Sequence, residues 1–224
     1  MSRHKKYRWN LDWLKSTSVN LIWKVLSSEG AKVYFVGGCV RDSIQGRRIK
    51  DIDIATDALP LDVIKLAQGA GLKVMKTGFE YGSVSIMIKK DCFEVTTLRT
   101  DLVTDGRRAK VSFSTNILDD AKRRDFTMNA IYMTINGELV DPIFGLKDAV
   151  NSYVRFIGDP KKRIQEDYLR ILRYFRFISI YGKKKDSDNS GLIKIFSDAR
   201  YFVKLLSPET VSYTHLTLPT ILLV

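Results

Sequence analysis

The chain has 224 residues, which suits one large domain or two small ones, and its hydrophobic fraction of 45% is enough for a folded core and argues against disorder. Lys and Arg exceed Asp and Glu by 37 to 25, and this net charge of +12 favours a polyanionic partner such as a nucleic acid. Two cysteines and two histidines exclude a disulfide framework, a zinc finger and an iron–sulfur site. No apolar run approaches the roughly 20 residues that cross a bilayer, and the basic start has no secretory h-region, so we expect a cytoplasmic protein with no membrane partner.

The first part of the chain predicts alternating helices and strands. Residues 10–29 have apolar side chains at helical spacing, and residues 33–36 form a short apolar strand that stops at Gly37-Gly38. A short helix is expected over 39–45, a second strand over 51–55 and a helix over about 60–68.

The middle of the chain predicts two hairpins around a loop. Residues 83–89 and 92–98 alternate as strands do, which predicts an antiparallel hairpin. Residues 100–115 are polar and basic, so we expect a mobile loop there, followed by a helix over 117–124. Asn136-Gly137 then lies between two further strand segments and predicts a hairpin with a type I′ turn.

From Asp159 the pattern becomes helical. One long helix is expected from Asp159-Pro160 to about Gly182, then a solvated linker over 183–190 and a shorter helix over 192–206. The fold class is therefore α+β, with a mixed unit over residues 1–150 and an all-helical unit over 151–210. Residues 211–224 contain no Asp, Glu, Lys or Arg and are expected to be a non-native tail.

Two aspartates on the second strand are candidate metal ligands. Ile52 and Ile54 mark one strand face as core, so Asp51 and Asp53 project together from the other face, about 6–7 Å apart at Cα. Such a pair suits Mg²⁺, and two ions there can activate an attacking oxygen and steady a leaving pyrophosphate. The alternative is a solvated polar face.

Gly37-Gly38 is a candidate phosphate-binding turn. It follows a strand and opens a helix, and Arg41 lies one turn inside that helix. Glycines let the backbone approach a phosphate, and an arginine can clamp it. The alternative is an ordinary tight turn. The pattern matches neither a P-loop nor the dinucleotide-binding fingerprint.

Several segments, taken together, resemble one family. VGGCVRD (36–42) and KDIDIAT (50–56) are similar to the head-domain signature of bacterial class II tRNA nucleotidyltransferases, the CCA-adding enzymes, and their poly(A) polymerase relatives. The further segments that match in order are EVTTLRTD (94–101), KRRDFTMNAIY (122–132), DPIFGLKDA (141–149) and EDYLRILRYFRF (166–177). The resemblance covers about residues 20–210 and implies a polymerase β-like nucleotidyltransferase head with a mixed or antiparallel sheet, followed by a helical neck.

The resemblance implies a role for each matched residue in the head. Asp51 and Asp53 would be the catalytic, Mg²⁺-binding pair, and the turn with Arg41 would hold the triphosphate. Glu94 shares a strand face with Thr96 and is either a third acidic group near the metal or a structural hydrogen-bonding residue.

Further matched residues would contact the incoming nucleotide. Arg124 and Asp125 would meet it, with Asp125 accepting from the ribose hydroxyls and Asn129 as a helper. The alternative for this segment is a helix end with solvated charges.

The neck would read the nucleobase. Asp167 and Arg170 are three residues apart on the predicted long helix, so they would lie side by side and read the Watson–Crick edge of C or A while rejecting U and G. Arg173 and Arg176 continue this spacing and could reach phosphates or stabilise the pair, and Glu166 is a candidate supporting partner. The alternative is an intrahelical salt bridge.

The expected function is template-independent addition of C, C and A to the 3′ end of tRNA, using CTP and ATP with Mg²⁺ and releasing pyrophosphate. The alternatives with the same chemistry are A-adding, CC-adding and poly(A)-adding enzymes. A non-catalytic basic RNA-binding fragment is the alternative of another class, because the net charge alone would suffice for it. Family members continue well beyond the matched region, so this chain is expected to be an N-terminal fragment.

Overall fold

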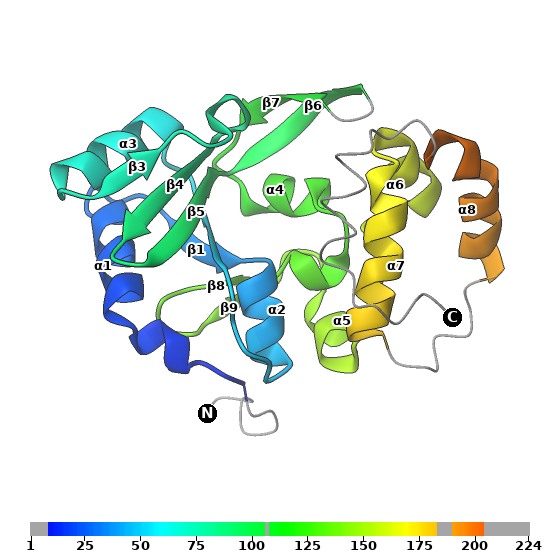
Figure 1. Ribbon diagram of the computed structural model, residues 1–224, viewed down its shortest axis with the longest axis horizontal. Helices are drawn as coiled ribbons and strands as arrows, with labels where there is room; N and C mark the ends of the chain where they lie inside the picture. Colours follow the sequence, from blue (N-terminus) through cyan, green and yellow to red (C-terminus); the bar gives the residue numbers. More distant parts are fainter. Residues whose placement is uncertain (1–8, 106–107, 183–189, 204–224) are drawn as a thin grey trace.

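The computed structural model describes residues 9–105, 108–182 and 190–203 (Figure 1). Within these ranges, no helix is both long and apolar enough to cross a membrane. The helices are α1 (Thr17–Leu26), α2 (Gly38–Ile44), α3 (Pro60–Gly69), α4 (Ile117–Arg123), α5 (Leu146–Asn151), α6 (Pro160–Glu166), α7 (Leu169–Tyr181) and α8 (Ser190–Val203), with short 3-10 turns η2 (Asp12–Lys15), η3 (Phe79–Tyr81) and η4 (Thr127–Asn129).

The described strands form one mixed sheet and one separate hairpin. The sheet has the order β3-β4-β5-β2-β1-β8-β9, in which β2 and β5 are parallel and the other neighbours are antiparallel. Its strands are β1 (Val33–Val36), β2 (Ile52–Thr56), β3 (Lys73–Met75), β4 (Ser83–Ile88), β5 (Asp91–Thr97), β8 (Tyr132–Met133) and β9 (Leu139–Val140), while the hairpin pairs β6 (Arg99–Asp105) with β7 (Arg108–Phe113). The expected mixed α+β fold is confirmed.

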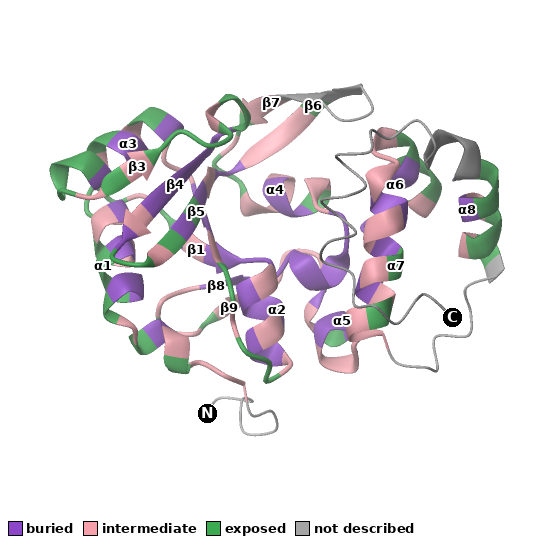
Figure 2. Ribbon diagram, in the orientation of Figure 1, coloured by how far each residue is buried: buried purple, intermediate pink, exposed green. Residues whose placement is uncertain are grey.

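The two faces of the sheet have different surroundings. Ile54 and Phe35, both 0% exposed, belong to the main core, which also contains the buried side chains of α1 and α3. Val36 and Ala55 lie on the opposite face in a smaller cluster. Because side chains alternate along a strand, Asp53 faces the same side as Ala55 and not the main core. In Figure 2 much of the ribbon of the central strands has the colour of buried residues.

The strand register places a row of residues across this second face. Each member is the partner of the next in the adjacent strand, and side chains opposite each other in neighbouring strands share a face. The row is Met75, Ser85, Glu94, Asp53, Val36, Tyr132 and Val140. The sheet therefore puts Asp53 between Glu94 and Val36.

The expected mobile loop over 100–115 is wrong for the residues that the structure describes there. They form the antiparallel β6–β7 hairpin, with a register shift between Asp101 and Val103. A two-stranded ribbon can be polar on both faces, so the polar composition did not distinguish a strand from a loop. β6 contacts α4, so the hairpin lies beside the helix that directly precedes Arg124 (Figure 1).

The expected type I′ turn is also wrong. The β8–β9 hairpin exists, but only Gly137 has a positive φ, of 79°, whereas a type I′ turn needs a positive φ at Asn136 as well. The Gly137 amide donates to the Thr134 carbonyl at 3.0 Å, so the glycine follows the turn as its left-handed residue.

The predicted long helix is two helices. α6 ends at Glu166, Asp167 has extended backbone with φ −156° and ψ 105°, and α7 begins at Leu169. Asp167 Oδ1 accepts from the Leu169 amide at 2.9 Å, a local turn that separates the end of α6 from the start of α7. The expectation that Asp167 and Arg170 lie on one helical face is therefore wrong. The predicted linker over 183–190 lies almost wholly outside the described residues, and the predicted tail lies outside them entirely.

Candidate active site

Asp53 lies at the centre of the candidate site. It pairs in register with Val36 of β1 on one side and with Glu94 of β5 on the other. Neighbouring strands are about 4.8 Å apart, so the Asp53 and Glu94 side chains emerge next to each other. Asp51 immediately precedes β2 and is exposed, as is Glu94, while Asp53 is half-buried.

The carboxylates around Asp53 give the site a local excess of negative charge. The pKa of Asp53 is raised from 3.8 to about 6 by burial first and then by the charges of Glu94 and Asp51, against the opposing effect of Arg124 and Arg41. Carboxylate oxygens are the donors that Mg²⁺ takes, together with substrate phosphates. The donor set therefore fits such a cation, although no group of three or more His, Cys, Asp or Glu side chains in the described part of the chain already forms a metal centre.

The Gly37-Gly38 turn lies directly over Asp53. Gly37 has φ 74° and ψ −127°, a conformation of type II′ turns that favours glycine. A Cβ at position 37 would lie 3.4 Å from Asp53 Oδ2 and 3.8 Å from Arg124 Nη1. The turn backbone, the carboxylate and the guanidinium thus converge on one place.

Gly37→Ala is expected to destabilise the fold by about 1–3 kcal/mol, because alanine is strained in this backbone conformation. The Cβ itself would make only ordinary contacts, so crowding adds little. Urea unfolding measures the effect. Gly69→Ala is the matched control, since a Cβ there meets nothing within 4 Å and its φ is not positive. Equal stability of the two variants would contradict the strained turn.

Arg124 is held in place by a buried carboxylate that the sequence reasoning missed. Asp120, 1% exposed, accepts from Arg124 Nη2 at 2.8 Å, from Arg123 Nε at 2.7 Å and from the Tyr132 hydroxyl at 2.7 Å. Burial alone would raise the pKa of Asp120, but the charges of Arg124 and Arg123 outweigh it and hold the pKa far below its usual range. The signal was present, because Asp120 precedes the two arginines by three and four residues on a predicted helix.

The remaining nitrogen of Arg124 faces the site. Within the described ranges, no acceptor lies within hydrogen-bonding distance of Arg124 Nη1, which is the atom near Gly37 and Asp53. Asp120 therefore fixes one edge of the guanidinium and leaves the other edge for an anion.

Asp125, Asn129, Arg41 and Arg173 are brought together in a second, internal group. Asp125 Oδ2 accepts from Arg173 Nε and Nη2 at 2.8 and 2.6 Å, and Oδ1 accepts from Asn129 Nδ2 at 3.0 Å and from the Phe126 amide at 2.8 Å. Arg41, 6% exposed, donates through Nη1 to Asn129 Oδ1 at 2.7 Å. These residues join the sheet-bearing part of the chain to α7.

Arg170 belongs to a third group at the start of α7. Its Nη1 donates to Glu166 Oε2 at 2.6 Å and to the Arg163 carbonyl at 2.8 Å. Arg163 Nη2 in turn donates to the Arg123 and Arg124 carbonyls, each at 2.5 Å, which satisfies acceptors at the end of α4. Asp167 lies nearby, at the junction of α6 and α7. Arg176 lies further along the helix, near Tyr181, and is half-buried.

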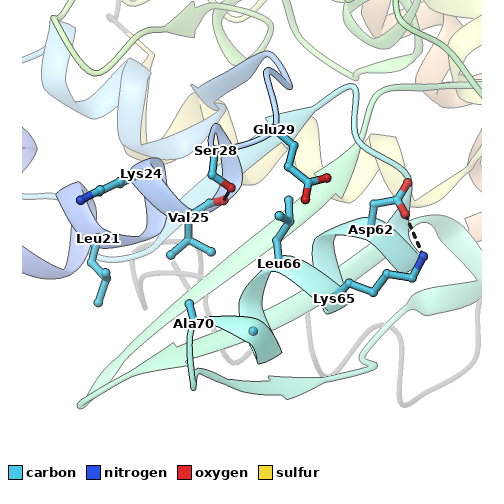
Figure 3. A pocket seen from close by; sticks show the side chains of 10 residues that line it. Leu21, Lys24, Val25, Ser28, Glu29, Asp62, Lys65, Leu66 and Ala70 are labelled. Carbon is cyan, nitrogen blue, oxygen red and sulfur yellow. Dashed lines mark hydrogen bonds and ion pairs between the residues drawn. The ribbon is translucent and has the colours of Figure 1, made fainter.

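Two hollows of the described chain differ in where they lie relative to these positions. One of about 740 Å³ lies between α1 and α3 and contains none of the predicted site residues; Figure 3 shows its leucines and the ion pair of Lys65 with Asp62 at 3.4 Å. One of about 270 Å³ lies where β6, α4 and α6 meet. Its lining residues are Thr100, Asp101, Leu102, Asp119, Lys122, Arg123, Arg163 and Glu166. The second hollow adjoins the Arg170 group.

Comparison with known proteins supports one family. The profile of the poly A polymerase head domain matches residues 33–155. The chain is 41% identical over 179 residues to the mitochondrial CCA tRNA nucleotidyltransferase 1 of Mus musculus, covering 79% of this chain and 41% of that protein. It is 42% identical over 163 residues to the CCA-adding enzyme of Bacillus subtilis, covering 72% of this chain and 40% of that enzyme.

Solved structures of nucleotidyltransferases are also similar to this chain. The CCA-adding enzyme of Bacillus stearothermophilus in complex with CTP matches with a TM-score of 0.64 and 41% identity, covering 70% of this chain and 37% of that one. A tRNA nucleotidyltransferase complexed with a primer tRNA and an incoming ATP analog matches with a TM-score of 0.57 and 30% identity, covering 70% and 44%. The chain spans about two fifths of the length of the curated relatives it matches. With the profile covering more than half of its residues, the chain belongs to the poly A polymerase head domain family of nucleotidyltransferases.

Proposed function

We propose that this chain carries the nucleotidyl-transfer site of an enzyme that adds C, C and A to the 3′ end of tRNA, using CTP and ATP without a nucleic-acid template. The observation that carries the proposal is the placement of the Asp53 carboxylate under the Gly37-Gly38 turn, with Arg124 Nη1 beside it. Similarity to enzymes named for CCA addition supports the substrate class. Residues 1–150 would be the catalytic head and residues 151–210 the base-reading neck.

Asp51 and Asp53 would hold Mg²⁺, and Glu94, which lies beside Asp53 in the sheet, would add negative charge that attracts the same cation. Bound Mg²⁺ would supply Lewis-acid stabilisation of the attacking and leaving oxygens. The carboxylates themselves would set the position of the RNA 3′ end relative to the α-phosphate.

The triphosphate would lie along the Gly37-Gly38 turn. Its backbone amides can approach an anion closely because neither glycine carries a Cβ, and Arg124 Nη1, which has no hydrogen-bond partner among the described residues, supplies a cationic donor beside Gly37. The RNA 3′ oxygen would attack the α-phosphorus, a new P–O bond would form, and pyrophosphate would leave as the bond to the β-phosphate breaks. Arg41 is committed to internal hydrogen bonds, so a phosphate contact from it would require that network to open.

The ribose contact of Asp125 stays a prediction, because the acceptor positions of this carboxylate are already occupied. A carboxylate has about four acceptor positions, and those of Asp125 already take four donated hydrogen bonds. A ribose hydroxyl could be accepted only if the contact with Arg173 loosens when the nucleotide binds.

Asp167 and Arg170 would read the base from the start of α7. Asp167 Oδ2 has no hydrogen-bond partner among the described residues, so it is available to an exocyclic amino group of C or A. Arg170 is 8% exposed and already donates to Glu166 and to two backbone carbonyls, so donation to ring acceptors would require these contacts to open. The broken helix gives each residue its own orientation, in contrast to the shared face that was expected.

The test is incubation of the chain with tRNA lacking its terminal CCA, Mg²⁺ and each labelled nucleoside triphosphate in turn. We expect incorporation of C and A only. Asp167→Ala should weaken this discrimination, with the exposed Lys65→Ala as control. Equal incorporation of all four nucleotides by the unaltered chain would contradict base reading. RNA binding with no incorporation would favour the non-catalytic alternative.

A further inference from the structure

Tyr181, the last residue of α7, makes an unusually close contact with Arg41. Its hydroxyl accepts from Arg41 Nη2 at 2.5 Å, and the Arg41 guanidinium carbon lies 4.0 Å from the centre of its ring. Arg47 adds a second contact, because its guanidinium lies 4.7 Å from the same ring and its Nη2 donates to the Ile180 carbonyl at 2.9 Å. One aromatic side chain thus joins the end of α7 to α2 and the segment after it.

The contact closes a ring of hydrogen bonds. From Tyr181 it passes to Arg41, then to Asn129 and Asp125, and returns to α7 at Arg173. Arg173 and Tyr181 are eight residues apart, or about 12 Å along a helix. α7 is therefore fixed at two separate points, which sets both its distance and its rotation relative to α2.

The same contact supports the candidate phosphate turn. The Arg41 amide donates to the Gly37 carbonyl at 3.0 Å, and a Cβ on Gly38 would lie 3.7 Å from Arg41 Nη2. The nitrogen that Tyr181 holds is thus the one beneath Gly38. A shift of Arg41 Nη2 would therefore change the packing beneath the Gly37-Gly38 turn, which lies over Asp53.

We propose that Tyr181 is a positioning residue for nucleotide selection: through Arg41 it holds α7, whose first turn would read the base, at one set distance from the phosphate turn. This rests on the proposed function, because it assumes that the triphosphate and the base are held by these two elements. A nucleotide bound at both would be selected by fit between them, so a looser joint would accept a wrong base more readily.

The experiment compares Tyr181→Phe, which removes only the hydroxyl, with Tyr181→Ala, which also removes the ring. The ratio of kcat/KM for CTP to that for UTP is measured in each sample; this ratio does not depend on how much of the sample is folded. We expect it to fall about tenfold in the Phe variant, as for the loss of one charge-assisted hydrogen bond, and further in the Ala variant. The matched control is Tyr153→Phe, because Tyr153 is 44% exposed and makes no side-chain hydrogen bond within the described part of the chain.

A second readout separates this inference from the proposed function. Hydrogen exchange of the α2 amides needs no activity, and Tyr181→Phe should speed it about tenfold over Arg41–Ile44, where the amides are bonded within the helix, but not in α3. Absence of nucleotide incorporation by the unaltered chain would overturn the proposed function. The exchange data would still show whether the Tyr181 contact stabilises α2. Unchanged exchange in α2, or an unchanged CTP-to-UTP ratio in an active chain, would overturn the positioning role.

Discussion

Asp53→Asn should reduce nucleotide incorporation by about 10³-fold or more and at the same time stabilise the fold above about pH 6 when no divalent cation is present. The loss of activity follows because a carboxylate that holds a catalytic cation contributes several kcal/mol of transition-state stabilisation, and each 1.4 kcal/mol is a factor of ten. The gain in stability follows because the folded chain keeps three acidic side chains near one another, and the substitution removes the most buried of them.

The pH dependence of this stability has a definite sign. The folded-state pKa of Asp53 is about 6, above its ordinary value of 3.8, so the folded chain binds the proton more tightly than the unfolded chain does. Stability therefore falls as the pH rises from about 4 to about 6. Asparagine cannot ionise, so the variant should match the unaltered chain near pH 4 and exceed it at pH 8.

Thermal unfolding at both pH values, with and without Mg²⁺, measures these effects. Mg²⁺ should raise the Tm of the unaltered chain and have little effect on Asp53→Asn. Glu94→Gln serves as an intermediate variant, because loss of that charge should lower the pKa of Asp53 while keeping the ligand pair. A variant that is less stable than the unaltered chain at pH 8 without Mg²⁺ would show that Asp53 is a structural residue.

The centre of the site could be predicted because its signals are local. Alternation around Ile52 and Ile54 was enough to place Asp53 on the face away from the main core, and strand, glycine pair and helix were enough to place the turn. The alternation of side chains along the strand placed Glu94 on the same face as Thr96. The parallel pairing of β2 with β5, which makes Glu94 the neighbour of Asp53, depends on sheet order. The order of strands in a sheet cannot be predicted from any single segment.

The contacts that position the site could not be predicted because they join distant segments. Arg41 and Tyr181 are 140 residues apart, and Asp125 and Arg173 are 48 apart, so neither pair leaves a periodic signal. The break between α6 and α7 was missed for a different reason. Its flanking residues have helical spacing, whereas Asp167 has extended backbone and its side chain accepts from the Leu169 amide, a local competition that apolar spacing does not reveal.

Asp120→Ala is expected to cost about 3–5 kcal/mol of unfolding free energy, since it removes one partner from a buried ionic cluster and leaves the others uncompensated. Asp120 is 1% exposed on its side chain, and Arg123 and Arg124 are each 17% exposed. The matched control is Asp12→Ala: Asp12 also pairs with a cation three residues away, but its side chain is 86% exposed, so the change should stay within about 0.5 kcal/mol.

Asp120→Asn separates the fold from the chemistry. The amide keeps the size of the side chain and can still accept from Tyr132, but it no longer holds the Arg124 guanidinium by charge. Under the proposed function, Arg124 Nη1 would meet the triphosphate only while the other edge of the guanidinium is fixed, so KM for the nucleotide should rise even at temperatures where the variant is fully folded. Urea unfolding and nucleotide titration of incorporation measure the two effects on one sample. An unchanged KM in a folded Asp120→Asn variant would mean that Arg124 finds its orientation without the carboxylate, and the anion-binding role of its free edge would then have no structural support.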